Sequence, residues 1–261
     1  MLGARKMGRR MSDRRHNSTY GWRAKLGLIV PPTNTVNEAE WSRQMPEGVT
    51  FHTVRMALHA DTHSAAGRRA LVADIAQRVR ELVQARVDVV AYACTAGSMV
   101  DPPRSLPDEV EALTGKPVVT TAASIVAALQ MLGAARVSVA TPYHTALNDH
   151  EVDFLAKNGI QTLRIVGLGL GSNGPVDYPL IAETPLEKVE ALARSVLVPG
   201  SDALLITCTD FPTLPLHEKL EKIFGVPVVT SNQATLWAAL RRAGISDDIP
   251  ALGRLMAKGS G

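Results

Sequence analysis

The chain of 261 residues contains two related copies of one unit. Three pairs of segments match in the same order along the chain, at offsets of 111, 114 and about 110 residues. The pairs are KLGLIVPPTNTVNE (25–38) with RVSVATPYHTALND (136–149), VDVVAYACTAGSM (87–99) with SDALLITCTDFPT (201–213), and GKPVVTTAASIVAAL (115–129) with GVPVVTSNQATLWAAL (225–240). Because order and spacing are both kept, we infer an internal duplication, which predicts two domains of the same fold.

The two cysteines of the chain, Cys94 and Cys208, stand at matching places in the two copies. A duplicated unit with one thiol per copy can place two thiols face to face across a pseudo-twofold axis, with room for a small molecule between them. A free thiol has a pKa of about 8.5, and a helix N-terminus lowers it. We therefore expect thiols of lowered pKa that act as base or nucleophile. Buried cysteines often only fill space, but the matched pair favours a functional site.

The formal charge of +3 is unevenly distributed. Residues 1–24 hold seven of the 28 basic residues and one of the 25 acidic ones, so the remainder has 21 basic and 24 acidic residues and a charge of −3. We expect residues 1–24 to form a disordered basic tail. A nucleic-acid partner is not predicted, because it calls for a basic stripe on a folded face.

No membrane partner is predicted either. The chain has neither the apolar region of a secretory signal nor a run of about 18 apolar residues that could span a bilayer. Two cysteines without an export signal are typical of a reducing compartment. The sequence therefore predicts a cytoplasmic protein.

Short apolar, β-branched runs alternate with longer amphipathic segments throughout the body of the chain. Strands are predicted at 26–30, 49–54, 87–93, 117–120, 137–141, 161–167, 203–207 and 227–231, and helices at 68–86, 122–133, 146–158, 185–197 and 233–244. Such alternation predicts parallel sheets covered by helices on both faces. The expected fold class is α/β, with two pseudo-twofold-related α/β sandwich domains of about four strands each. The first would comprise 25–120 plus 229–256 and the second 121–228, with the active site at their interface.

Ligands of such sheets bind beyond the carboxyl ends of the strands. Cys94 and Cys208 each follow a predicted strand directly, and Asn34 and Tyr143 follow the first strand of each copy. For Asn34 two roles stay open and are compatible, a helix cap and a ligand of the substrate. Further neutral donors suited to carboxylate or enolate oxygens are Thr95, Asn173 and Thr209.

Neither a nucleotide cofactor nor a metal is predicted. The glycine-rich segment GLGLGSNG (167–174) follows none of the dinucleotide or phosphate-binding patterns. His59 and His63 stand four residues apart, as metal ligands on a helix do, but they precede the predicted helix and lack the acidic partner of the usual motif.

The cysteine segments ACTAGS and TCTDFPTLP resemble the two cysteine loops of the aspartate/glutamate racemase superfamily. VPPTNT, TPYHT, SNG and SNQATLWAAL resemble, more narrowly, the maleate cis-trans isomerases and the related ectoine-utilisation proteins. The resemblance covers nearly all of residues 25–255. It implies two duplicated α/β domains, a catalytic cysteine pair and no cofactor.

The maleate isomerase pattern implies Cys94 as nucleophile and Cys208 as proton donor. Substrate carboxylates would be bound by Asn34, Tyr143 and Asn173, helped by the backbone after each cysteine at Thr95, Ala96, Thr209 and Asp210. The thiolate would add to the double bond of a cis-enedioate, which could then rotate before elimination gives the trans product, as from maleate to fumarate. The substrate is thus expected to be a small mono- or dicarboxylate, and the family resemblance implies a homodimer or homotetramer.

Two departures keep other functions open. Maleate isomerases tend to have bulky apolar residues after the first cysteine, whereas 95–98 are Thr, Ala, Gly and Ser. Residues 208–212 also resemble racemases, in which each thiol serves one face of an α-carbon. The alternatives are an amino-acid racemase or epimerase, as in ectoine breakdown, and a non-catalytic protein that binds small carboxylates. Arylmalonate decarboxylases keep only the later cysteine, so Cys94 argues against decarboxylation.

Overall fold

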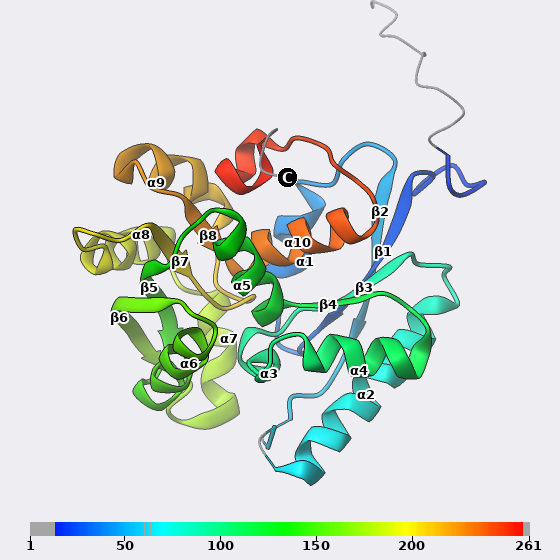
Figure 1. The fold of residues 1–261 in the computed structure, drawn as a ribbon, viewed down its shortest axis with the longest axis horizontal. Helices are drawn as coiled ribbons and strands as arrows, with labels where there is room; N and C mark the ends of the chain where they lie inside the picture. Colours follow the sequence, from blue (N-terminus) through cyan, green and yellow to red (C-terminus); the bar gives the residue numbers. More distant parts are fainter. Residues whose placement is uncertain (1–13, 60, 63, 258–261) are drawn as a thin grey trace, which may run out of the picture.

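Two parallel four-stranded sheets form the framework of the molecule (Figure 1). The computed structural model describes residues 14–59, 61–62 and 64–257. The first sheet has the order β2-β1-β3-β4 and the second the order β6-β5-β7-β8. The strands are β1 (Ala24–Val30), β2 (Val49–Arg55), β3 (Val89–Tyr92), β4 (Val118–Thr120), β5 (Arg136–Tyr143), β6 (Gln161–Leu170), β7 (Ala203–Ile206) and β8 (Val228–Thr230). The predicted α/β class with two four-stranded parallel sheets is confirmed.

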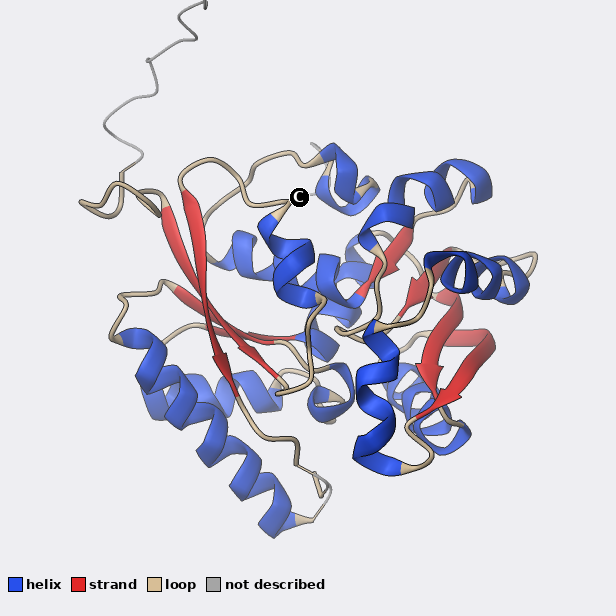
Figure 2. Cartoon of the chain, turned by 180° about the vertical axis from the view of Figure 1, so that it is seen from behind, coloured by secondary structure: helices blue, strands red, loops and turns tan. Residues whose placement is uncertain are grey.

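Helices cover both faces of each sheet, and Figure 2 shows them between and around the two groups of strands. The helices are α1 (Asn37–Ser42), α2 (Ala65–Val83), α3 (Thr95–Ser98), α4 (Ser105–Thr114), α5 (Thr121–Met131), α6 (Thr145–Lys157), α7 (Tyr178–Ala182), α8 (Leu186–Val196), α9 (His217–Phe224) and α10 (Ser231–Arg242). Short 3-10 turns occupy Gly174–Asp177, Leu214–Leu216, Pro250–Leu252 and Arg254–Met256. Helices α4 and α9 were not among the predicted ones, although each ends at a glycine in the left-handed region, Gly115 and Gly225.

The duplication extends to individual contacts. In the first copy, Asp88 Oδ2 accepts a hydrogen bond from the backbone N–H of Lys25 at 2.8 Å. In the second copy, the matching Asp202 Oδ2 accepts one from the N–H of Arg136, also at 2.8 Å. Each aspartate thereby fixes the start of the equivalent strand in its sheet, by accepting from the second residue of β1 and from the first residue of β5.

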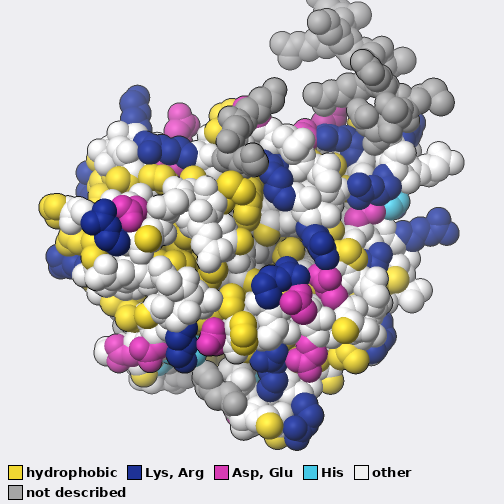
Figure 3. All heavy atoms as spheres, viewed as in Figure 1, with side chains coloured by type: hydrophobic (Ala, Val, Ile, Leu, Met, Phe, Trp, Pro, Cys, Tyr) yellow, Lys and Arg dark blue, Asp and Glu magenta, His cyan; other side chains and the backbone are white. Residues whose placement is uncertain are grey.

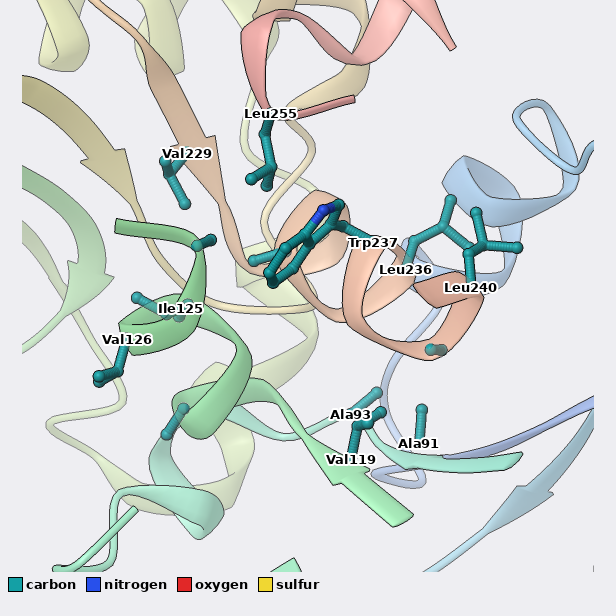
Figure 4. Packing of buried hydrophobic residues seen from close by; sticks show 14 of the residues in the cluster. Ala91, Ala93, Val119, Ile125, Val126, Val229, Leu236, Trp237, Leu240 and Leu255 are labelled. Carbon is teal, nitrogen blue, oxygen red and sulfur yellow. The ribbon is translucent and has the colours of Figure 1, made fainter. Parts of the chain in front are cut away.

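The centre of the molecule is a pair of equivalent helices. Helix α5 follows β4 and helix α10 follows β8; they pack against each other, and each contacts strands of both sheets. Figure 4 shows buried apolar side chains from both helices meeting there, with strand residues around them. The labelled ones are Ala91, Ala93, Val119, Ile125, Val126, Val229, Leu236, Trp237, Leu240 and Leu255. This shared core fixes the two sheets relative to each other, and with them the strand ends that carry the cysteines.

Part of the predicted tail belongs to the folded body. Residues 1–13 lie outside the described residues, but residues 14–23 contact the rest of the protein. His16 Nε2 lies 2.8 Å from Asp88 Oδ2, Arg15 donates to the carbonyl of Ala243 at 2.8 Å, and Arg23 pairs with Asp247 at 2.5 Å. The basic residues of this segment therefore neutralise acidic residues of the body, which the sequence pattern alone did not reveal.

Charges are mixed on the face shown in Figure 3, where Lys and Arg side chains stand scattered among Asp and Glu. Several pair directly, as Arg242 does with Glu111 at 2.9 Å. Among the residues that the structure describes, no helix is both long and apolar enough to cross a bilayer.

Candidate active site

The two cysteines occupy equivalent positions beyond the carboxyl ends of their sheets. Cys94 is the second residue after β3, and Cys208 is the second residue after β7. The thiols lie within electrostatic range of each other, since the charge of Cys94 is among the causes that raise the pKa of Cys208. Cys94 is buried, with 6% of its surface exposed, and Cys208 is half-buried.

Cys94 caps the short helix α3. Its Sγ accepts a hydrogen bond from the backbone N–H of Gly97 at 3.4 Å, and its carbonyl accepts one from Ser98 Oγ at 2.6 Å. Burial raises the pKa of the Cys94 thiol, while the Gly97 N–H and the Tyr92 hydroxyl favour the thiolate. The expectation of a lowered thiol pKa is wrong here, because α3 has only four residues and desolvation outweighs its N-terminal dipole.

Cys208 has a strained backbone. Its φ of 91° lies in a region that residues other than glycine rarely adopt, and its N–H donates to Ser231 Oγ at 3.0 Å. Burial, the Asp210 carboxylate and the charge of Cys94 raise the pKa of Cys208 to about 12, although the Asp210 N–H and the Tyr143 hydroxyl oppose this. The lowered pKa expected from the sequence is wrong for this thiol too. A cysteine that keeps its proton at neutral pH is suited to donate it.

Tyr143 lies close to the thiol of Cys208. It is the last residue of β5, 5% exposed. Burial keeps its pKa well above the ordinary value, and its hydroxyl hydrogen-bonds Cys208 while also feeling the charge of Cys94. The phenol therefore remains a neutral donor beside Cys208 and within electrostatic range of Cys94.

Asn34 and Thr209 join the loops of the two copies. Asn34 Nδ2 donates to Thr209 Oγ1 at 3.1 Å, and Thr209 Oγ1 donates to the carbonyl of Ala93 at 3.1 Å. The other end of the Asn34 side chain, Oδ1, accepts from the N–H groups of Val36 and Asn37 at the start of α1, at 3.2 and 3.0 Å. Asn34 thus binds backbone N–H groups at the start of α1 as a capping side chain does, although the N-cap position of α1 is Val36; its role toward substrate stays a prediction.

Three more predicted residues lie near the thiols. Thr95 Oγ1 is 2.9 Å from Ser231 Oγ, the group that receives the Cys208 N–H. Ala96 lies half-buried in α3. The Asp210 carboxylate accepts from the N–H groups of Thr35 and Val36 at 2.8 and 3.3 Å, and burial raises its pKa to about 6. Asp210 thus faces the first copy with its side chain and Cys208 with its N–H.

Asn173 makes its hydrogen bonds within its own loop. It is exposed in the loop after β6, and its amide nitrogen is 3.2 and 3.1 Å from the two carboxylate oxygens of Asp177. These bonds favour an ionised Asp177, whose pKa they lower. The role predicted for Asn173 therefore has no contact with Cys94 or Cys208 to support it.

Two buried glutamates escaped the sequence analysis. Glu40 and Glu151 are equivalent in the duplication at the offset of 111, but their surroundings differ. Glu40 joins α1 to the second copy, since it accepts from the N–H groups of Thr213 and Leu214 at 2.6 and 2.7 Å and from Asn232 Nδ2 at 2.7 Å. Extending the first matched segment by two residues would have paired the two glutamates.

Glu151 has a single hydrogen bond among the described contacts of its side chain. Thr207, the residue before Cys208, donates from Oγ1 to Glu151 Oε2 at 3.1 Å. A charge on Glu151 also contributes to the raised pKa of Tyr143. Glu151 is 1% exposed. Burial raises its pKa to about 8, so this carboxyl is neutral at pH 7 and adds no negative charge beside the thiols.

Glu151→Gln should stabilise the fold at neutral and alkaline pH. Between pH 4.5 and pH 8 the unfolded chain ionises this residue while the folded chain keeps its proton, so the free energy of unfolding of the native chain falls as pH rises. The advantage of Glu151→Gln should widen by up to about 1.4 kcal/mol per pH unit in this window and stay constant above it. Urea unfolding at several pH values measures the difference.

The matched control is Glu40→Gln. Both carboxylate oxygens of Glu40 accept hydrogen bonds, so the NH2 group of a glutamine would face a group that itself donates. The substitution should lower the free energy of unfolding, by about 1–3 kcal/mol. An advantage of Glu151→Gln that does not change with pH would contradict a buried neutral Glu151.

Other candidate sites lie apart from the thiols. A cavity of about 370 Å3 lies between the residues after α3 and helix α6, and is lined in part by Met99, Asp101, His150 and Phe154 but by neither cysteine. His59 is held by Asp74 at 3.1 Å, whereas His63 lies outside the described residues. Within the described ranges, no group of three or more His, Cys, Asp or Glu side chains could hold a metal ion.

Several known proteins resemble this chain in sequence and in fold. A model of the arylmalonate decarboxylase family matches residues 26–256. Maleate isomerase from Nocardia farcinica is 32% identical over 250 residues, which are 90% of this chain and 96% of that protein.

Two solved structures are similar as well. Nocardia farcinica maleate cis-trans isomerase bound to TRIS has a TM-score of 0.78 and 30% identity, covering 91% of this chain and 99% of that one. A cysteine-to-serine mutant of that enzyme, with a covalently bound succinylcysteine intermediate, has a TM-score of 0.78 and 30% identity, covering 90% and 98%. The predicted resemblance to the maleate isomerases is confirmed, and the chain belongs to the arylmalonate decarboxylase family, with the fold of the aspartate/glutamate racemase superfamily.

Proposed function

We propose that the protein is a cysteine-based cis-trans isomerase of a small cis-enedioate, with maleate converted to fumarate. The observation that carries this proposal is the different charge environment of two thiols that lie within electrostatic range of each other. Burial raises the pKa of both thiols, and a tyrosine hydroxyl and a backbone N–H oppose this at each, but the Asp210 carboxylate raises the pKa of Cys208 further, whereas no carboxylate is among the causes at Cys94. Maleate isomerases among the similar proteins, one with a succinylcysteine, support the same chemistry.

The reaction begins with the Cys94 thiolate. As its sulfur bonds to one alkene carbon, the π bond breaks and the electron pair moves through the other carbon into its carboxylate, which gives an enediolate. Cys208 then delivers its proton to that carbon and leaves a succinyl thioether on Cys94. The former double bond is now single and rotates. The Cys208 thiolate takes the proton back, the carbon–sulfur bond breaks, and the trans alkene forms.

Neutral donors stabilise the transient enediolate. Tyr143 and Asn34 are buried near the thiols; Tyr143 carries an O–H, and Asn34 Nδ2 has a second N–H besides the one that it donates to Thr209. In a site closed to water such donors interact with a developing oxyanion more strongly than they would in solvent. The neutral state of Glu151 at pH 7 limits repulsion of the two substrate carboxylates.

A racemase or epimerase of an amino acid is the second candidate. It is favoured by the similar settings of the two sulfurs, because each has a tyrosine hydroxyl and a following backbone N–H beside it. Such settings also suit two-base chemistry on an α-carbon. The prediction against decarboxylation depends on Cys94 and is unchanged.

Proton NMR of the purified protein with maleate in D2O separates these functions. We expect the maleate signal to decay as a fumarate signal grows. Unchanged maleate, together with loss of the α-proton signal of aspartate or glutamate to solvent, would establish the racemase instead. We also infer a homodimer or homotetramer from the family resemblance alone, and a cytoplasmic location from the two free cysteines.

A further inference from the structure

Tyr92 is a second tyrosine at the thiol pair, and it is not one of the residues that the sequence motifs single out. It ends β3, two residues before Cys94. Because side chains two residues apart leave an extended chain on the same face, the phenol extends beside the thiol. Both residues belong to the cluster between the first sheet and helices α2 and α4, where Tyr92 is 2% exposed.

The phenol oxygen and the sulfur are in contact. The Tyr92 hydroxyl hydrogen-bonds the Cys94 thiol and favours its ionised form. The space at Gly97 shows that the two groups are neighbours, because a Cβ added there would lie 2.5 Å from Tyr92 Oη and 3.1 Å from Cys94 Sγ. The phenol therefore occupies the space that a larger residue after Cys94 would need, which accounts for the glycine in the run of small residues.

The phenol stays protonated under all conditions in which the enzyme would work. Burial raises the pKa of Tyr92 well above its ordinary value, and the charges of Cys94 and Asp74 raise it further. Asp74 on α2 is itself held by Arg78 at 3.3 Å and His59 at 3.1 Å. On the other side of the sulfur the groups that titrate are Cys208 and Tyr143. Tyr92 is thus a permanent donor toward Cys94.

The two tyrosines are not copies of each other. In the duplication Tyr92 pairs with Ile206, and Tyr143 pairs with Pro32. Cys94 therefore has the phenol of Tyr92 and Cys208 that of Tyr143, and the two tyrosines occupy different positions of the repeat. Two hydrogen bonds, from Tyr92 and from the Gly97 N–H at 3.4 Å, converge on Cys94 Sγ.

We propose that Tyr92 is a catalytic residue whose hydroxyl donates a hydrogen bond to Cys94 Sγ and stabilises the thiolate that adds to the substrate. The role in addition rests on the proposed isomerase function, whereas the effect on the thiol does not. A hydrogen bond to a charged group contributes enough that its loss raises a thiol pKa by roughly one unit or more. Tyr92→Phe removes only the hydroxyl and keeps the ring in the cluster.

The test measures the thiol pKa directly. In a Cys208→Ser background, Cys94 is the remaining cysteine, and the pH dependence of its alkylation by iodoacetamide gives its pKa without any substrate. Tyr92→Phe should raise this pKa by roughly one unit or more. Tyr143→Phe, the matched control, removes the same group from the Cys208 side and should move the Cys94 pKa less.

A second variant guards against misfolding of Tyr92→Phe, which circular dichroism would reveal. Gly97→Ala displaces the phenol from the sulfur without removing it, and should shift the pKa in the same direction. An unchanged Cys94 pKa in the folded variants would overturn the proposal. With both cysteines present, Tyr92→Phe should also reduce kcat/KM for maleate about tenfold or more. A protein that shows the pKa shift but does not isomerise maleate would refute the isomerase function and leave the thiol contact standing.

Discussion

Cys94→Ser should reduce the turnover of maleate by about three or more orders of magnitude. A serine hydroxyl remains protonated at every working pH and adds poorly to an alkene, whereas a thiolate adds readily. The replacement is nearly isosteric, so serine can keep the hydrogen bond from the Gly97 N–H and its capping position at α3. The rate of fumarate formation measured by NMR reports the loss, and thermal unfolding shows that the fold is retained.

The size of this effect distinguishes chemistry from binding. A protein that only binds small carboxylates should tolerate Cys94→Ser, because the donors Asn34 and Tyr143 are unchanged. Maleate affinity measured by calorimetry should therefore change far less than turnover. Turnover within tenfold of the native rate would contradict a covalent role for Cys94.

Cys208→Ser should reduce the turnover of maleate by a comparable factor. Unlike Cys94→Ser, it should leave a covalent adduct on the Cys94 sulfur. Solvent or the serine hydroxyl can slowly protonate the enediolate, which leaves a succinyl group on the Cys94 sulfur. Elimination of the thioether to fumarate needs a base that removes the proton from the carbon next to the carbon–sulfur bond. The Cys208 thiolate is such a base because its raised pKa of about 12 makes it strongly basic, whereas serine cannot provide one. The thioether should therefore accumulate.

The framework of this protein could be predicted from its sequence because the duplication constrains it twice. Apolar β-branched runs gave the strands, and the matched segments predicted that both sheets would share one order, as β2-β1-β3-β4 and β6-β5-β7-β8 do. Cysteines directly after equivalent strands had to meet at the same edge of the fold. For these features the local pattern and the topology agree.

Features that depend on packing between distant segments could not be predicted from the sequence. Tyr92 lies within an apolar strand segment, where an aromatic residue is typical of core, and only the folded chain shows that its hydroxyl hydrogen-bonds the Cys94 thiol. Glu151 lies in a helix that has other charged residues, and its burial depends on how α6 meets β5 and β6. The raised thiol pKa values follow from desolvation, which no motif encodes. Asn173 was assigned by motif alone, and its partner Asp177 lies four residues further on.

The mass of the intact Cys208→Ser protein after incubation with maleate is the most direct measurement. Isomerisation through Cys94 predicts the added mass of one maleate per chain, located on Cys94 by peptide mapping, and no such addition in a Cys94→Ser, Cys208→Ser double variant. An unmodified Cys208→Ser chain that still converts maleate to fumarate at the native rate would contradict the covalent mechanism.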